Sequence, residues 1–123
     1  MNKILKLFLI FLLIFFTTNS NGISSEEKIK IGLLVPMNGD NKDLGKLIIK
    51  SIRMALKDIN SSNIEIYPKD SGSNPTQALK SASEFENMGI RIVIGPIFYK
   101  SLIYLDEIEN ITFLSLTNKT IDL

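Results

Sequence analysis

Two short runs of almost uninterrupted apolar residues limit what this chain can fold into. They are IKIGLLVP, from Ile29 to Pro36, and IRIVIG, from Ile90 to Gly95. Such runs are typical of strands that are covered on both faces, as in parallel sheets. A third run, IEIYP from Ile64 to Pro68, alternates apolar with polar residues and ends in a proline. That pattern predicts a strand at the edge of the sheet.

Helix-like patterns separate these strands. Apolar residues recur at helical spacing from Leu44 to Ile59, which predicts an amphipathic helix with Leu47 in its buried stripe. A second helix is predicted to begin after Asn74, a capping residue that is followed by Pro75, with Gln77 placed for a capping box. Its predicted buried stripe is Ala78, Leu79, Ala82, Phe85 and Met88, and Gly89 ends it.

A shorter helix around Ser101 to Glu109 and a fourth strand, TFLSL from Thr112 to Leu116, complete the pattern. Strand and helix then alternate throughout, which predicts a three-layer α/β fold with a parallel sheet in the strand order 2-1-3-4. The fourth strand would leave an apolar edge open to pairing. We therefore expect the chain to be the N-terminal part of a longer α/β protein.

The first 22 residues have the layout of a secretory signal peptide. Lys3 and Lys6 precede the apolar block LFLIFLLIFF, Leu7 to Phe16, and a polar stretch follows. The block is shorter than the roughly 20 residues that span a bilayer as a helix, so membrane contact is expected only if the segment stays uncleaved. We predict residues 1–22 as signal, residues 23–123 as the folded part, and a periplasmic location.

Composition excludes several functions. The chain has no cysteine, no histidine and no tryptophan, which rules out disulfides, cysteine or histidine metal sites and histidine-based triads. Without the signal segment, basic and acidic side chains nearly balance, so no strong basic footprint indicates nucleic acid. We expect no metal, no cofactor and no enzymatic activity.

The stretch GDNKDLGKL, Gly39 to Leu47, is a near-match to a phosphate-binding loop. Such a loop has four residues between its glycines and a serine or threonine after the lysine. Here five residues separate Gly39 from Gly45, and Leu47 occupies the hydroxyl position. A nucleotide-binding loop is therefore not predicted.

Lys46 instead belongs with Lys50, Arg53 and Lys57, which share one face of the same helix. We interpret this basic stripe as a solvated face, with a docking surface for an acidic partner as the alternative.

The strand order predicts where a ligand would bind. In open parallel sheets, ligands lie outside the carboxyl ends of the strands, where the strand order reverses. That point is formed by the loops 37–43, 96–101 and 115–118, which offer hydroxyls, an amide, aromatic rings and backbone N–H groups. Asp40 and Asp43 are the nearby carboxylates, and we interpret one as a helix cap and the other as solvated.

At this point the sequence resembles a known family. The segments IGLLVPMNGDNKDLGKLIIKSIRMALKDIN, YPKDSGSNPTQALKSASEFENMGIRIVIGPIF and TFLSLTN are similar to the first lobe of type I periplasmic binding proteins, the leucine-binding-protein-like receptors. The resemblance implies two lobes with a ligand in the cleft between them, of which this chain would hold an incomplete first lobe. By position it implies a cleft wall made of Asn38, Gly39, Phe98, Tyr99, Ser101, Ser115, Thr117 and Asn118.

The resemblance implies the substrate-binding component of an ABC-type importer for amino acids or a similar small polar ligand, with a membrane permease as partner. The pattern from Ile94 to Phe98 is also similar to the penicillin-binding protein activators, which share the fold. For that branch the implied role is regulation of cell-wall synthesis through contacts with a cell-wall synthase.

Overall fold

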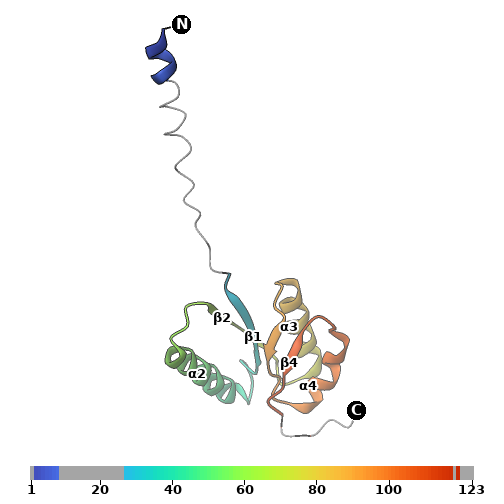
Figure 1. Ribbon diagram of the computed structural model, residues 1–123. Coiled ribbons are helices and arrows are strands. Elements are labelled where there is room, and N and C mark those ends of the chain that lie inside the picture. The colour runs from blue at the N-terminus through green and yellow to red at the C-terminus, as the bar shows by residue number, and fades with distance from the viewer. Residues whose placement is uncertain (1, 9–26, 118, 120–123) are drawn as a thin grey trace.

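The computed structural model describes residues 2–8, 27–117 and 119 (Figure 1). Residues 3–8 form a short exposed helix. The remaining elements, in chain order, are β1 (Ile29–Val35), α2 (Lys42–Ile59), β2 (Ile64–Asp70), α3 (Pro75–Asn87), β3 (Ile92–Ile94), α4 (Tyr99–Tyr104), the 3-10 turn η1 (Leu105–Glu107) and β4 (Thr112–Leu114). The predicted signal cleavage region and Asn118 lie outside the described residues. Within the described ranges, no helix is long and apolar enough to cross a membrane.

The four strands form one parallel sheet in the order β2-β1-β3-β4. Ile29 pairs with Ile64 at the start of the β1–β2 ladder, and Val35 pairs with Asp70 at its end. This confirms the predicted strand order, including the edge position of β2.

Helices cover both faces of the sheet, which confirms the three-layer architecture. In Figure 1, α2 lies on one side of the sheet, and α3 and α4 lie together on the other. The main core lies between the sheet and the α3 side, because alternate residues of β1 and β3 point there. Its buried members are Leu34, Ala78, Ala82, Phe85, Ile90, Val93, Leu105 and Ile111.

Gly32 allows α3 to pack closely on β1. A Cβ atom at this position would lie 2.8 Å from Cγ2 of Val93 and 3.1 Å from the ring of Phe85. The side chain that is absent from Gly32 therefore makes room for the Phe85 ring against the sheet.

Helix α2 lies in a different rotation from the predicted one. Leu47, predicted to be buried, is 60% exposed, and Leu44 is 40% exposed. Ile48, Ile52 and Leu56 are half-buried, and the buried residue of the helix is Gly45. The prediction was wrong for Leu47 because the helix turns its glycine, the residue that allows closest approach, toward the end of β1.

Helix α3 begins as predicted but its last apolar residue differs. The Asn74 side chain accepts a hydrogen bond from the Gln77 N–H at 2.9 Å, and Pro75 is the first helical residue. Gly89 has the positive φ of +72° expected of a helix stop. Met88 caps the helix at its C-terminal end and is 38% exposed. Its predicted burial was therefore wrong, because Met88 follows the last residue that packs on the sheet.

The third predicted helix is shorter and starts earlier than the sequence indicated, since α4 covers Tyr99–Tyr104 and continues as η1.

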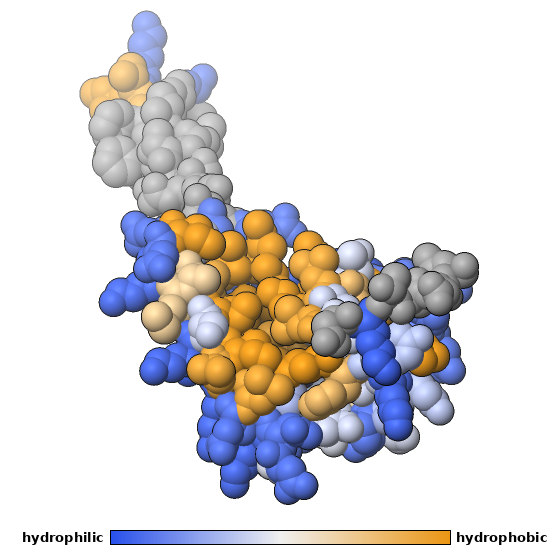
Figure 2. Space-filling model, turned by 90° about the horizontal axis from the view of Figure 1, so that it is seen from below, coloured by the Kyte–Doolittle hydropathy of each residue, from blue (hydrophilic) through white to orange (hydrophobic). Residues whose placement is uncertain are grey.

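The α2 side of the sheet is less fully covered than the α3 side. Ile92 and Leu114, which alternate with the core-facing Val93 and Phe113, are 39% and 53% exposed. Seen from below, Figure 2 shows apolar side chains gathered over a large area of the molecule. The apolar fourth strand is thus an exposed edge, as predicted.

Candidate functional site

The carboxyl ends of the four parallel strands bring the chain's polar loops to one edge of the sheet. The loop after β1 leads into α2, and the loop after β2 leads into α3. Two cross-links hold these loops together: Asn41 donates to the Ser73 hydroxyl at 3.2 Å, and the Ser71 N–H donates to the Val35 carbonyl at 2.9 Å.

Asp70, the last residue of β2, connects both loops through its carboxylate. Oδ1 accepts the N–H groups of Met37 at 2.7 Å and of Gly72 at 2.9 Å. Oδ2 accepts the side-chain amide of Asn38 at 3.0 Å. One carboxylate therefore ties the first loop of the site to the second.

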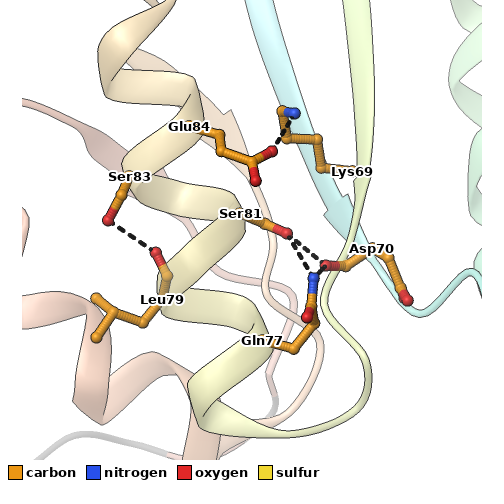
Figure 3. Close-up of polar contacts among 7 residues, drawn as sticks. All are labelled: Lys69, Asp70, Gln77, Leu79, Ser81, Ser83 and Glu84. Carbon is orange, nitrogen blue, oxygen red and sulfur yellow. Dashed lines mark hydrogen bonds and ion pairs between the residues drawn. The ribbon is translucent and has the colours of Figure 1, made fainter.

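The main-chain oxygen of Asp70 makes a separate set of contacts with α3. It accepts the Ser81 hydroxyl at 2.6 Å and the Gln77 side-chain amide at 3.5 Å. Figure 3 shows this oxygen facing the helix while the carboxylate points away from it. Gln77 was predicted to reach back to the helix cap, but its amide lies instead between Asp70 and Ser81. An acceptor from the neighbouring strand replaces the local one.

A groove of about 650 Å³ opens at this edge beside the starts of α3 and α4. This volume is within the range of small-molecule sites. Its lining combines apolar and aromatic surface with hydroxyls and cations, from Ser73, Pro75, Ile97, Phe98, Tyr99, Lys100, Ile103, Thr117 and Lys119.

The groove carries positive charge from two lysines. Lys100 and Lys119 both line it, and none of its described lining residues is acidic. The ammonium group of Lys119 lies 5.5 Å from the centre of the Tyr99 ring, a cation–π arrangement. An aromatic platform beside cations suits a ligand with both a flat apolar part and a negative group.

The structure brings several of the predicted site residues to this groove. Phe98, Tyr99 and Thr117 line it. Asn38 and Gly39 are exposed at the same edge of the sheet but lie outside the lining.

The predicted serines are placed differently. Ser115 is half-buried and donates to the Pro96 carbonyl at 3.4 Å. Ser101 is buried at 1% exposure, with no hydrogen-bond partner for its hydroxyl among the described residues. In this structure Ser101 therefore does not present its hydroxyl to the groove.

Sequence reasoning missed the groove residues at the start of α3 and Ile103 in α4. Pro75 was assigned only to the helix start, Ser73 was quoted only within a longer segment, and Ile103 was placed in the predicted helix around Ser101 to Glu109. Asp70 was also missed, although it lies inside the quoted segment YPKDSGSNP. The alternation of β2 gives no sign that its last residue reaches across to the loop after β1.

The near-match to a phosphate loop has a packing explanation. A Cβ at Gly45 would lie 1.7 Å from the Pro36 carbonyl oxygen. Helix α2 can therefore approach the end of β1 only with glycine here. Asn41 is the N-cap of α2 without a side-chain cap bond, and Asp43 pairs with Lys46 at 3.3 Å. The expectation that an aspartate caps this helix was wrong.

Within the described ranges, no group of three or more acidic, histidine or cysteine side chains is placed to hold a metal ion.

The lowered pKa values of two carboxylates lead us to expect a loss of stability in acid. Desolvation raises the pKa of Asp70, but hydrogen bonds from Met37, Gly72 and Asn38 together outweigh it and lower that pKa. The hydrogen bond and charge of Lys69 lower the pKa of Glu84 (Figure 3). Both groups bind protons more readily in the unfolded chain than in the folded protein. Their contribution to the free energy of unfolding is therefore complete at a pH above their unfolded-state pKa values, and it is lost as the pH falls through their folded-state pKa values.

We therefore expect the free energy of unfolding to decline below about pH 4. Urea titrations across the acid range measure this decline, and Glu84→Gln should reduce its slope. An equal slope in the variant would contradict the role of the Lys69 pair.

Comparison with known proteins identifies the family. The family model described as periplasmic binding protein matches residues 28–106. The chain belongs to this family. A search of curated proteins found no match.

Among solved structures, the chain is similar to a leucine-binding protein from Thermotoga maritima, with a TM-score of 0.67 and 19% identity over 74% of this chain and 28% of that one. It is also similar to a Rhodopseudomonas palustris solute-binding protein in complex with 4-hydroxybenzoate, with a TM-score of 0.66 and 18% identity over 74% and 27%.

A third similar structure is the C-domain of LpoA from Haemophilus influenzae, a regulator of PBP1A, with a TM-score of 0.59 and 24% identity over 70% of this chain and 27% of that one. The chain thus spans little more than a quarter of the length of these structures. At these identities the likeness shows the fold, which is a fragment of the type I periplasmic binding protein fold.

Proposed function

We propose that the protein is an extracytoplasmic ligand-binding receptor, the substrate-binding component of an ABC-type importer for amino acids or a similar small polar ligand. The observation that carries this proposal is the groove at the carboxyl ends of the strands, where the aromatic rings of Phe98 and Tyr99 meet the Thr117 hydroxyl and two lysines. The groove serves as one wall of a cleft between two lobes.

The family supports this reading. A leucine-binding protein and a solute-binding protein in complex with 4-hydroxybenzoate share this fold. In the proposed mechanism, hinge closure buries the ligand between the lobes, and the closed form is presented to a membrane permease in the periplasm. Residues 1–22 would serve as the export signal.

The positive charge of the groove restricts the class of ligand that fits it. Lys100 and Lys119 provide donors for a carboxylate, and Tyr99 provides a flat surface for an apolar side chain or ring. An amino-acid ligand would also need an acidic partner for its ammonium group. The described lining lacks one, so the opposite wall would supply it.

A thermal-shift screen with leucine, other amino acids, benzoate and 4-hydroxybenzoate tests the receptor function. A ligand at about 100 times its Kd stabilises the folded state by about 2.7 kcal/mol, which raises the melting temperature. We expect Tyr99→Ala to weaken the binding of the ligand that responds by about tenfold, because stacking area is lost.

Tyr104→Ala is the matched control. Tyr104 is on the same helix, is 52% exposed and does not line the groove. Equal losses in both variants, or no shift with any compound, would contradict the proposal.

A second candidate function is regulation of a cell-wall synthase through protein contacts, as LpoA regulates PBP1A. The observation that favours it is the basic stripe of α2, where Lys46, Lys50, Arg53 and Lys57 are all exposed. Such a surface fits an acidic partner. If no small molecule binds while a purified synthase does, and Lys50→Glu with Arg53→Glu abolishes that binding, the regulator function replaces the receptor function.

A further inference from the structure

The loop after β1 has little packing of its own. Beyond Pro36, Met37 to Asp40 are exposed, and a Cβ placed on Gly39 would have no atom within 4 Å. The ladder between β1 and β2 ends with the Val35–Asp70 pair, followed by the single bond from the Ser71 N–H to the Val35 carbonyl. Backbone pairing therefore stops just before the segment that carries Asn38 and Gly39.

Beyond the end of the ladder, the Asp70 carboxylate connects the two loops by hydrogen bonds. It accepts one bond from the Met37 backbone and one from the Asn38 side chain, and it stays attached to its own loop through the Gly72 N–H. Hydrogen bonds to a charged acceptor are stronger than those between neutral groups. This single side chain is placed to hold the exposed loop in one position.

We propose that Asp70 is the positioning residue of the ligand cleft: without contacting the ligand itself, it sets the position of the loop that carries Asn38 and Gly39, at the same edge of the sheet as the groove. This inference rests on the proposed binding function. It also makes a prediction about the protein without ligand, so the positioning role of Asp70 and the binding function can be contradicted separately.

The geometry separates the role of each oxygen. Asp70→Asn can keep an acceptor at the Oδ1 position, where Met37 and Gly72 donate, but it places an NH₂ group against the NH₂ group of Asn38. Asp70→Ala removes all three bonds. Asn38→Asp places two carboxylates side by side, and the double variant Asp70→Asn with Asn38→Asp restores a donor facing an acceptor.

The main-chain contact offers a matched control. Ser81→Ala removes the 2.6 Å bond to the Asp70 carbonyl and leaves the carboxylate untouched. A purely structural role of Asp70 in docking α3 would make Ser81→Ala and Asp70→Ala behave alike. A positioning role would make them differ at the loop after β1.

The test measures amide hydrogen exchange at Met37 in the full chain without ligand. We expect exchange about tenfold faster in Asp70→Ala than in the wild type, and unchanged in Ser81→Ala, because the Met37 N–H donates to the Asp70 carboxylate, whereas Ser81 contacts only the Asp70 main-chain oxygen. The single variants Asn38→Asp and Asp70→Asn should also exchange faster at Met37. The double variant should bring the hydrogen-exchange rate back toward that of the wild type.

An unchanged Met37 rate in Asp70→Ala, or a double variant looser than both single variants, would overturn the proposal. If Asp70→Ala does not fold, the swap between Asn38 and Asp70 still decides it. In a second arm, leucine, benzoate and 4-hydroxybenzoate are titrated, and Asp70→Ala should weaken whichever binds by about tenfold while Ser81→Ala does not. Absence of binding to the wild type would count against the binding function alone, since the exchange rates stand independently.

Discussion

Replacing Gly45 by alanine is expected to lower the free energy of unfolding by about 3 kcal/mol, at the upper end of the usual cost of overpacking. On an exposed helix the same change would stabilise, because glycine costs up to about 1 kcal/mol relative to alanine. Here the new methyl group would lie 1.7 Å from the Pro36 carbonyl oxygen. The helix must move away from the end of β1, so the sign reverses.

Urea denaturation measures the effect through its midpoint, with an unchanged slope expected for a protein that still unfolds in one step. Ser51→Ala is the control, since Ser51 is exposed on the same helix and should change stability by about 0.5 kcal/mol or less. A Gly45→Ala variant as stable as the wild type would show that α2 does not approach Pro36 as closely as described.

The second large effect is expected for Phe85→Ala, at about 3–5 kcal/mol. Phe85 is fully buried in the centre of the main core, and its ring packs over Gly32. Removing the ring leaves a cavity that the backbone of β1 cannot fill, because its nearest residue has no side chain. The loss therefore includes both the transfer free energy of the ring and the cavity.

Met88→Ala is the matched control for Phe85→Ala, because Met88 follows the same helix and is partly exposed. We expect a loss of about 1 kcal/mol or less in that variant. Both variants can be compared by the midpoint of urea denaturation. Similar losses in the two variants would contradict the central position of Phe85 in the core.

Much of the fold was predictable because it depends on short-range patterns. The apolar runs at Ile29 and Ile90 predicted central strands, and the Asn74–Pro75 pair predicted the start of α3. Strand order then followed from the rules for parallel crossovers. The rotation of α2 was not predictable from periodicity, because the placement of Gly45 against Pro36 depends on two segments coming together.

The candidate site was predictable only in part. Phe98, Tyr99 and Thr117 follow strands whose ends meet at one edge, so topology alone brought them together. Ser101 was predicted in the cleft wall from its position along the chain. The sequence does not indicate that the Ser101 hydroxyl is buried while the rings of Phe98 and Tyr99 line the groove. Which side chains of a short helix face the interior depends on how the helix packs.

Local periodicity was enough to predict the alternation of strands and helices and the parallel sheet, and composition was enough to exclude cysteine and histidine chemistry from this chain. Which face of α2 is covered and which residues line the groove depend on how the elements pack against one another. The link that Asp70 makes between two loops through one side chain depends on the same packing. The bonds of Asp70 with Met37 and Asn38 join residues more than 30 positions apart, so their geometry is set only when the sheet brings the ends of β1 and β2 together.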